Sequence, residues 1–415
     1  MNIPFWEMFQ GIYTLFTAEP IVSAMRIILI LLGAVFVYYG FKGVLEGLIM
    51  IPMGIAMIGV NAGTMIIQAA SATQAAQTGN LFVDPLITNN NTLMNFLQIN
   101  FLQPIFNFAF SNGLIPCLIF MGIGAITDID FMIAKPFTSL ILAVAAEFGT
   151  VFTFPIAMAW GFSPGQAASI AIVGGADGPM VLFTSLTLAK ELFVPIAVIA
   201  YMYLALVYVG YPYLIKGLVP KKIQGATMDP GDIPKVNKTE KLVFTIVATA
   251  VLCILFPVAA PLFASFFIGV AIKEGNVPRH LEFLSGPLLY GSTFFLGFVL
   301  GALLTADTIL SGSVWKLLIL GCISLLLSGL GGLAGGMIAY KASKGKINPL
   351  IGIAGVSCVP STAKVAQKCA FQANKRAMIL PFAMGPNVAG VITTAIIAGL
   401  YMTSVPMISH WLVGG

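Results

Sequence analysis

The chain has 415 residues, of which 59% are hydrophobic and 8% are charged; its formal net charge is +5 and its mean hydropathy is +0.99. Soluble domains carry roughly a quarter charged residues, so these charges are too few to cover a surface that faces water. The composition therefore excludes a soluble protein and predicts an all-α polytopic membrane protein surrounded by the lipid bilayer. The 43 glycines and 24 prolines further predict interrupted helices, which are typical of transporters.

Apolar stretches long enough to cross a bilayer recur along the whole chain. A spanning helix needs about 20 mostly apolar residues. Residues 163–190 and 347–377 are long enough but are interrupted by Gly, Pro and polar residues, and residues 94–111 look like an interfacial helix. We expect about nine to eleven transmembrane helices with two broken or re-entrant segments. The uninterrupted candidates are 21–40, 48–70, 112–126, 136–160, 192–215, 242–258, 286–306, 312–339 and 378–402.

Lysines in the loops predict the orientation, because cytoplasmic loops carry an excess of positive charge. Residues 216–241 hold six lysines and three prolines and are predicted to form a cytoplasmic linker, whereas residues 71–92 hold one charge and are predicted to be external. The loop with Lys341 and Lys344 should again be cytoplasmic. We interpret these charges as topology determinants, expect no nucleic-acid partner, and place the protein in a bacterial plasma (inner) membrane.

Thiol or imidazole metal sites are not expected. His280 and His410 are far apart, and the cysteines lie in or beside apolar runs without the spacing of metal ligands. We expect the thiols to be small packing groups.

The two halves of the chain resemble each other. FMGIGAITDID (120–130) is echoed by FLGFVLGALLTAD (295–307), and FSPGQAASIAIVGGADGP (162–179) by INPLIGIAGVSCVPS (347–361). Such halves predict an internal repeat, inverted if an odd number of helices separates them, with binding near the midplane. The expected parts are N-terminal scaffold helices (1–111), a first repeat (112–215), the basic linker (216–241), further scaffold helices (242–285) and a second repeat (286–415).

Asp177 is the strongest candidate for chemistry. It lies in VGGADGPM (173–180), inside an apolar segment, where a carboxylate is costly unless it is paired or binds an ion. The neighbouring glycines and proline interrupt the helix and free backbone carbonyls, which are hard oxygen ligands suited to Na⁺. The alternative is an aspartate that caps a helix end at the membrane surface.

The matching segment of the second half offers neutral oxygens from Asn348 and Ser357, with Gly352 at a spacing that permits close helix approach. Such hydroxyls often bond only their own backbone. Lys364 follows and is either an interfacial lysine or an anchor for a carboxylate substrate.

Three further polar residues lie in apolar helices. Tyr203 belongs to an interfacial belt or relays a proton beside the carboxylate, and Asn387 in MGPNVAG (384–390) is expected to line the site. Glu147 is a second intramembrane carboxylate, in a polar cavity wall or paired with a lysine. Asp128, Asp130 and Asp307 are expected to end helices at the interface.

Four motifs resemble one known family. FMGIGAITD, VGGADGPM, KINPLIGIAGVSCVP and AMGPNVAGVI, in this order, are similar to the beta subunit of the biotin-dependent sodium-pumping decarboxylases, which act on oxaloacetate, methylmalonyl-CoA, glutaconyl-CoA or malonate. The likeness runs from about residue 112 to the C-terminus, outside the central linker. The oxaloacetate enzymes have arginine at the position of Lys364.

This resemblance implies a scaffold part and a core part with two broken hairpins that cross at the ion site and move like an elevator. It implies a carboxybiotin decarboxylase that exports Na⁺ and consumes a proton, with catalytic Asp177, Tyr203 and Lys364. It implies that Lys364 and Ser357 bind carboxybiotin and that Na⁺ is held by Asp177, Asn348, Gly352, Ser357 and Asn387.

The resemblance also implies partners. A biotin carrier protein would supply carboxybiotin, with no covalent biotin on this chain, beside an alpha carboxyltransferase subunit and a small gamma or delta membrane subunit; we also expect a homo-oligomer. The alternative function is a stand-alone sodium-coupled carrier for an organic anion, and a non-catalytic membrane scaffold is a third.

Overall fold

A computed structural model of the chain describes residues 9–43, 45–67, 77–83, 100–229, 236–310 and 314–413. The described chain is helical apart from two short antiparallel strands, β1 (Met65–Ile67) and β2 (Gln77–Gly79). It divides into two compact units, Met1–Ile115 with Tyr290–Lys316 and Pro116–Leu289 with Leu317–Gly415.

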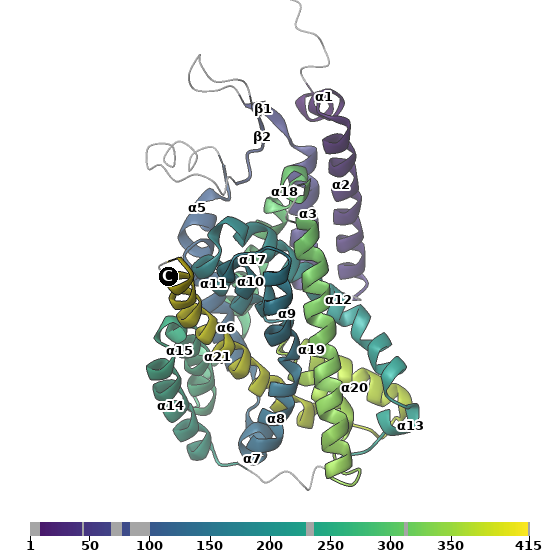
Figure 1. The fold of residues 1–415 in the computed structure, drawn as a ribbon, viewed down its shortest axis with the longest axis vertical. Coiled ribbons are helices and arrows are strands. Elements are labelled where there is room, and N and C mark those ends of the chain that lie inside the picture. The colour runs from purple at the N-terminus through teal and green to yellow at the C-terminus, as the bar shows by residue number, and fades with distance from the viewer. Residues whose placement is uncertain are drawn as a thin grey trace, which may run out of the picture. The chain divides into compact units, whose positions relative to one another are not determined.

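The first unit is built on a pair of apolar helices, α2 (Pro20–Phe41) and α3 (Gly47–Ala62), which pack side by side (Figure 1). The helix expected over 48–70 ends at Ala62, because the following backbone pairs β1 with β2. Of the helix expected over 94–111, residues 94–99 lie outside the described residues. The remaining elements of this unit are α1 (Gln10–Thr17), α5 (Gln103–Ile105), η2 (Phe106–Phe110), most of α17 (Leu289–Leu303) and α18 (Ala306–Leu310).

The second unit holds both segments that were expected to be interrupted. The first runs through α10 (Pro164–Ala171), η3 (Ile172–Gly175) and α11 (Gly178–Leu188), and the second through η8 (Pro349–Gly355) and α20 (Ser361–Ala373). Both interruptions are confirmed, since non-α backbone separates the helical parts of each.

The other elements of the second unit are longer helices and short connecting turns. They are α6 (Leu114–Ile126), α7 (Asp130–Ala134), α8 (Pro136–Ala146), α9 (Phe148–Ala159), η4 (Lys190–Leu192), α12 (Phe193–Leu218), α13 (Lys221–Gln224), α14 (Lys238–Leu255), η6 (Pro257–Ala259), α15 (Ala260–Glu274), α16 (Pro278–Phe283), η7 (Leu284–Leu288), most of α19 (Val314–Ala342) and α21 (Leu380–Val413).

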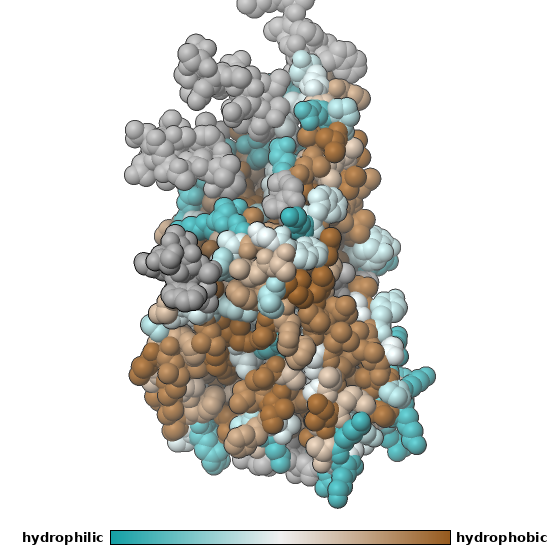
Figure 2. All heavy atoms as spheres, viewed as in Figure 1, coloured by the Kyte–Doolittle hydropathy of each residue, from teal (hydrophilic) through white to brown (hydrophobic). Residues whose placement is uncertain are grey.

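The protein is a multi-pass membrane protein. Within the described residues, six helices are long and apolar enough to cross a bilayer, or up to eight if each of two bent pairs is one span. The expected nine to eleven also counted shorter or more strongly interrupted stretches, such as α3 and α11. One span, Pro257–Glu274, was missing from the expected set because its prolines and small residues divide the apolar run. Apolar side chains cover α14 and α15 in Figure 2, and hydrophilic ones gather where α13 and α19 end.

Ion pairs connect three helices at one end of the second unit. Asp130 begins α7 and pairs with Lys241 of α14, which also lies 3.6 Å from Glu274 of α15. Lys273 donates to the carbonyl of Thr127 at 2.5 Å. These charges therefore hold helix ends together.

Candidate functional site

The two broken segments meet at Gly175 and Ser357. The carbonyl oxygen of Gly175 accepts hydrogen bonds from the Ser357 backbone N–H at 2.9 Å and from the Ser357 hydroxyl at 2.8 Å. The same hydroxyl lies 3.0 Å from the Thr394 hydroxyl of α21. The Gly175 carbonyl, which is free of regular helical hydrogen bonding in η3, thus connects the first break to the second. Ser357 in turn connects both breaks to α21.

The first break needs residues without bulk. A Cβ atom on Gly174 would lie 2.5 Å from the Ser324 hydroxyl oxygen and 2.6 Å from the Thr150 backbone nitrogen, closer than real Cβ contacts allow. Ala176 then adopts the left-handed conformation, with φ of 54°, which a non-glycine residue tolerates at an energetic cost. The glycine therefore lets η3 lie directly against α9 and α19.

Asp177 follows this turn and begins α11. Its carboxylate accepts a hydrogen bond from the Met180 backbone N–H at 3.1 Å, and the Ser357 hydroxyl interacts with it electrostatically. The residue is only 5% exposed. Asp177 is thus a helix cap, as in the alternative interpretation of the sequence. It caps a half-helix inside the protein, however, rather than a helix end at the membrane surface.

Glu147 brings a second carboxyl group to the same place. It lies between α8 and α9, is 2% exposed, and interacts electrostatically with Asp177. Hydroxyls of Thr150 and Thr394 donate to it, and Thr393 donates at 3.2 Å. Among the ion pairs of the described residues none includes Glu147. Of the two alternatives for Glu147, the polar wall therefore agrees with the structure, since threonines rather than a lysine surround it.

Asn387 fastens the second break to α21. Its amide nitrogen donates to the carbonyls of Ala354 at 2.7 Å and Val356 at 3.3 Å and to the Thr362 hydroxyl at 2.9 Å. Its side-chain oxygen is buried and has no hydrogen-bond partner among the described residues. Because a buried, unpaired amide oxygen is costly, this atom is a fitting ligand for a cation.

Oxygen atoms dominate the cluster of Glu147, Asp177, Ser357 and Thr394, which we call the crossing site. Asn387 borders it through its hydrogen bond to the carbonyl of Val356, the residue before Ser357. Carboxylate, hydroxyl, amide and carbonyl oxygens are ligands for hard cations. The described residues contain no group of three or more His, Cys, Asp or Glu that would hold a metal ion. Hard oxygen donors also suit an alkali cation, and unwound carbonyls such as that of Gly175 in an apolar interior are a known setting for Na⁺.

Two of the predicted site residues make their contacts elsewhere. The Tyr203 hydroxyl donates to the Leu318 carbonyl of α19, whereas Tyr201 is the tyrosine whose hydroxyl lies against Gly178, next to Asp177. The Asn348 amide donates to the carbonyls of Gln224 at 2.9 Å and Ala226 at 2.7 Å. Asn348 thus holds the linker, and Tyr203 holds α19.

Gly352 and Lys364 also lie outside the contacts of the carboxyl pair. A Cβ atom on Gly352 would lie 2.7 Å from the Gly336 backbone nitrogen, so this glycine lets η8 touch α19 backbone to backbone. Lys364 is exposed in the first turns of α20. Sequence reasoning missed Thr150, Thr393 and Thr394, since a hydroxyl in an apolar helix usually bonds its own backbone.

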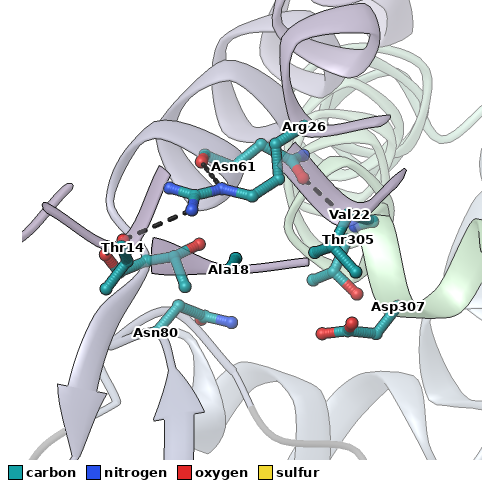
Figure 3. Close-up of a pocket in the computed structure, with 10 residues that line it drawn as sticks. Thr14, Ala18, Val22, Arg26, Asn61, Asn80, Thr305 and Asp307 are labelled. Atoms are coloured by element: carbon teal, nitrogen blue, oxygen red, sulfur yellow. Dashed lines mark hydrogen bonds between the residues drawn. The ribbon is translucent and has the colours of Figure 1, made fainter. Parts of the chain in front are cut away.

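The first unit has a polar pocket of its own (Figure 3). Arg26 is 3% exposed and donates to the Asn61 carbonyl at 2.9 Å and to the Thr14 hydroxyl at 3.3 Å. Asp307 lies across the pocket and supplies an opposing charge. The Asn61 side chain joins α3 to the turn before α18 through Leu304 at 2.7 Å and Ala306 at 3.2 Å. This pocket explains how an arginine is buried in an apolar helix.

The chain is similar to known proteins over nearly its whole length. Residues 25–405 match the family described as the Na⁺-transporting oxaloacetate decarboxylase beta subunit. The chain belongs to this family. As a beta subunit, it is 51% identical over 398 residues to the carboxybiotin decarboxylase of Malonomonas rubra, covering 96% of this chain and 98% of that protein.

Other beta subunits are similar over much of the chain. The methylmalonyl-CoA decarboxylase subunit beta of Propionigenium modestum is 36% identical over 387 residues, which cover 91% of this chain and 94% of that protein. The oxaloacetate decarboxylase beta chain of Haemophilus ducreyi is 40% identical over 301 residues, covering 71% and 68%. The predicted family is thereby confirmed.

Proposed function

We propose that this beta subunit decarboxylates carboxybiotin delivered by a biotin carrier protein and couples this reaction to the export of Na⁺, with consumption of one proton. The observation that carries the proposal is the crossing site, where Glu147 and Asp177 are buried together among hydroxyls. Two carboxyl groups in an apolar interior repel each other when both are ionised. A Na⁺ ion between them relieves this repulsion, and a proton can do the same.

Exchange of Na⁺ for a proton then follows from the chemistry of the pair. Na⁺ enters from the cytoplasm and binds Asp177 and Glu147, with oxygens of Ser357, Thr394 and Asn387 completing its shell. A proton that reaches the pair replaces the charge of Na⁺ and releases it to the outside. Moving one charge outward against about 150 mV costs roughly 3.5 kcal/mol, so export needs a coupled reaction.

Decarboxylation supplies that free energy. The bond between the ureido nitrogen and the carboxylate carbon breaks, CO₂ leaves, and the electron pair stays on nitrogen, which takes the proton that the site releases. We propose that Lys364 holds the carboxylate until this step. A pocket that strips water from the carboxylate favours the loss of CO₂.

Partner subunits would supply the rest of the reaction. An alpha carboxyltransferase would choose the acid substrate and load biotin on the carrier, and a gamma or delta subunit would complete the membrane part. The names of the relatives, beta chains of several decarboxylases, support this division of labour.

Asp177→Asn tests the central assignment. The substitution keeps the helix cap but removes the charge, so Na⁺ uptake into inverted vesicles and Na⁺-dependent CO₂ release from N-carboxybiotin should both fall by at least about 100-fold, which corresponds to the loss of a hydrogen-bonded buried charge. Asn276→Asp, at an exposed turn, is the control. Full Na⁺ transport by Asp177→Asn would refute the proposal. Na⁺-driven uptake of an organic anion without CO₂ release would instead favour a stand-alone carrier.

A further inference from the structure

A groove lies at the end of the second unit that we expect to face the cytoplasm. It has a volume of about 580 Å³ between the end of α12, the linker helix α13 and the end of α20, and its lining includes Lys216, Lys221, Gln224 and Gln372. Figure 1 shows α13 beside the C-terminal end of α20. No carboxylate is among the described residues that line it, so its field is positive.

The groove continues into a basic stripe on α20. Lys364, Lys368 and Gln372 are spaced four residues apart and are all exposed, so they share one face of the helix. Lys216 of α12 and Lys368 of α20 both act electrostatically on the buried thiol of Cys369, and α12 packs against α20. Among the described residues, none of these lysines forms an ion pair within the chain. Their charges are available to a ligand.

The stripe leads to the second break. Gln372 follows Lys364 by eight positions along α20, a rise of about 12 Å at 1.5 Å per residue. Lys364 lies in the first turns of this helix, directly after the break that contacts Gly175 through Ser357. The positive end of the helix dipole adds to the field there. Positive potential thus extends from the groove to the segment that joins the crossing site.

We propose that this groove admits the carboxylated biotin arm and that the exposed face of α20 guides its carboxylate from Lys216 and Lys221 past Lys368 to Lys364; the inference rests on the proposed function. A cleft lined by one sign of charge concentrates a ligand of opposite sign. The carboxylate of N-carboxybiotin is such a ligand, and its ring system needs an open groove rather than a point contact.

The groove is also connected to the moving parts that the proposed mechanism needs. The linker beside it is held by Asn348 at one end of the second broken segment and by Asn374, whose amide donates to the Gly225 carbonyl at 2.9 Å, at the other. An arm that enters between α13 and α20 therefore touches the elements that clasp this segment. Binding of the substrate arm in this groove can therefore shift the position of the second broken segment.

The experiment uses the purified, reconstituted complex and free N-carboxybiotin as probe, with KM and kcat measured separately. Lys216→Gln combined with Lys221→Gln should raise KM about tenfold with kcat nearly unchanged, and Lys368→Gln should act in the same direction. Lys216→Arg keeps the charge and should keep the wild-type KM. Lys190→Gln is the matched control, because Lys190 is exposed just before α12 begins, at the helix end opposite Lys216.

Salt gives a second readout. The wild-type KM should rise between about 0.01 and 0.15 M ionic strength, where the screening length falls from about 30 to 8 Å, and the double variant should lose most of this dependence. An unchanged KM and salt dependence in the double variant would overturn the inference. So would an effect seen only with carrier-bound carboxybiotin, which would assign the lysines to the carrier's surface. If the wild-type complex itself released no CO₂ from carboxybiotin, the proposed function would fail instead.

Discussion

Single side chains decide whether the crossing site can hold an ion. Asp177 and Glu147 are both nearly inaccessible to solvent, and the hydroxyls around them come from α9, α21 and the second break. Hydrogen bonds to a charged group contribute about 1.5–3 kcal/mol each. Removing one hydroxyl should therefore change the apparent affinity for Na⁺ measurably without removing the carboxyl pair.

Thr394→Val tests this expectation. The variant keeps the shape of the side chain but loses the hydroxyl that contacts Glu147 and Ser357. The Na⁺ concentration for half-maximal CO₂ release should rise by at least about tenfold, in line with the loss of one charge-assisted hydrogen bond. Thr187→Val serves as control, since its exposed hydroxyl bonds only the Phe183 carbonyl of its own helix. Equal Na⁺ dependence in both variants would exclude Thr394 from the ion shell.

Asn61 is a single side chain that we expect to affect the stability of the first unit. Asn61→Ala leaves the Leu304 carbonyl and the Ala306 N–H without their partner, which should cost about 1–3 kcal/mol of unfolding free energy. Thermal unfolding in detergent should show a lower midpoint than for Thr17→Ala, whose exposed hydroxyl bonds only its own turn. An unchanged midpoint would show that water replaces the amide at this turn.

At the scale of elements, the broken segments depend on backbone contact. Gly174→Ala would press a methyl group into Ser324 and the start of α9, and overpacking of this kind costs about 1–3 kcal/mol. We expect the joint between Gly175 and Ser357 to shift, so that Na⁺-dependent activity falls while Gly210→Ala, with open space around its Cβ position, behaves as wild type. Activity and thermal stability of both variants, measured together, check the prediction; a silent Gly174→Ala would mean that α9 yields easily.

Asn348 allows a second prediction about an element, because its contact with the linker competes with its predicted role as an ion ligand. Its amide binds two linker carbonyls and its side-chain oxygen caps η8 through the Leu350 N–H at 2.9 Å. Asn348→Ala should thus loosen residues 224–226 and speed limited proteolysis of the linker severalfold, with little change in the Na⁺ concentration for half-maximal activity. A large rise in that concentration with unchanged proteolysis would instead support the predicted role of Asn348 as an ion ligand.

For the whole molecule, the order of elements along the chain supports the predicted repeat. A helix ending near an acidic residue, a longer helical stretch, a broken segment and a further long helix occur from α6 to α12 and again from α17 to α21. The two compact units do not follow these halves, since α17 and α18 group with the N-terminal helices whereas α6 and α7 group with the second unit. Inversion of the repeat and elevator movement stay predictions.

The class of protein, the position of both breaks and the family could all be predicted from the amino-acid sequence. Too few charges exclude a water-facing surface, clusters of glycine, proline and polar residues mark the two broken segments, and the four motifs lie in the order typical of the family. These properties are local or compositional, so they can be predicted without coordinates.

Which polar residues contact one another could not be predicted from the sequence and depends on the packing of the whole chain. In the structure, Asp177 and Ser357 lie beside Glu147 and Thr394. Asn348 instead binds the linker, and the Tyr203 hydroxyl binds a carbonyl of α19. A buried carboxyl, hydroxyl or amide must find a partner, but every polar residue in an apolar segment has this need. Which partner it finds depends on the packing of segments up to about 250 residues apart, such as Glu147 and Thr394, and no local pattern contains that information.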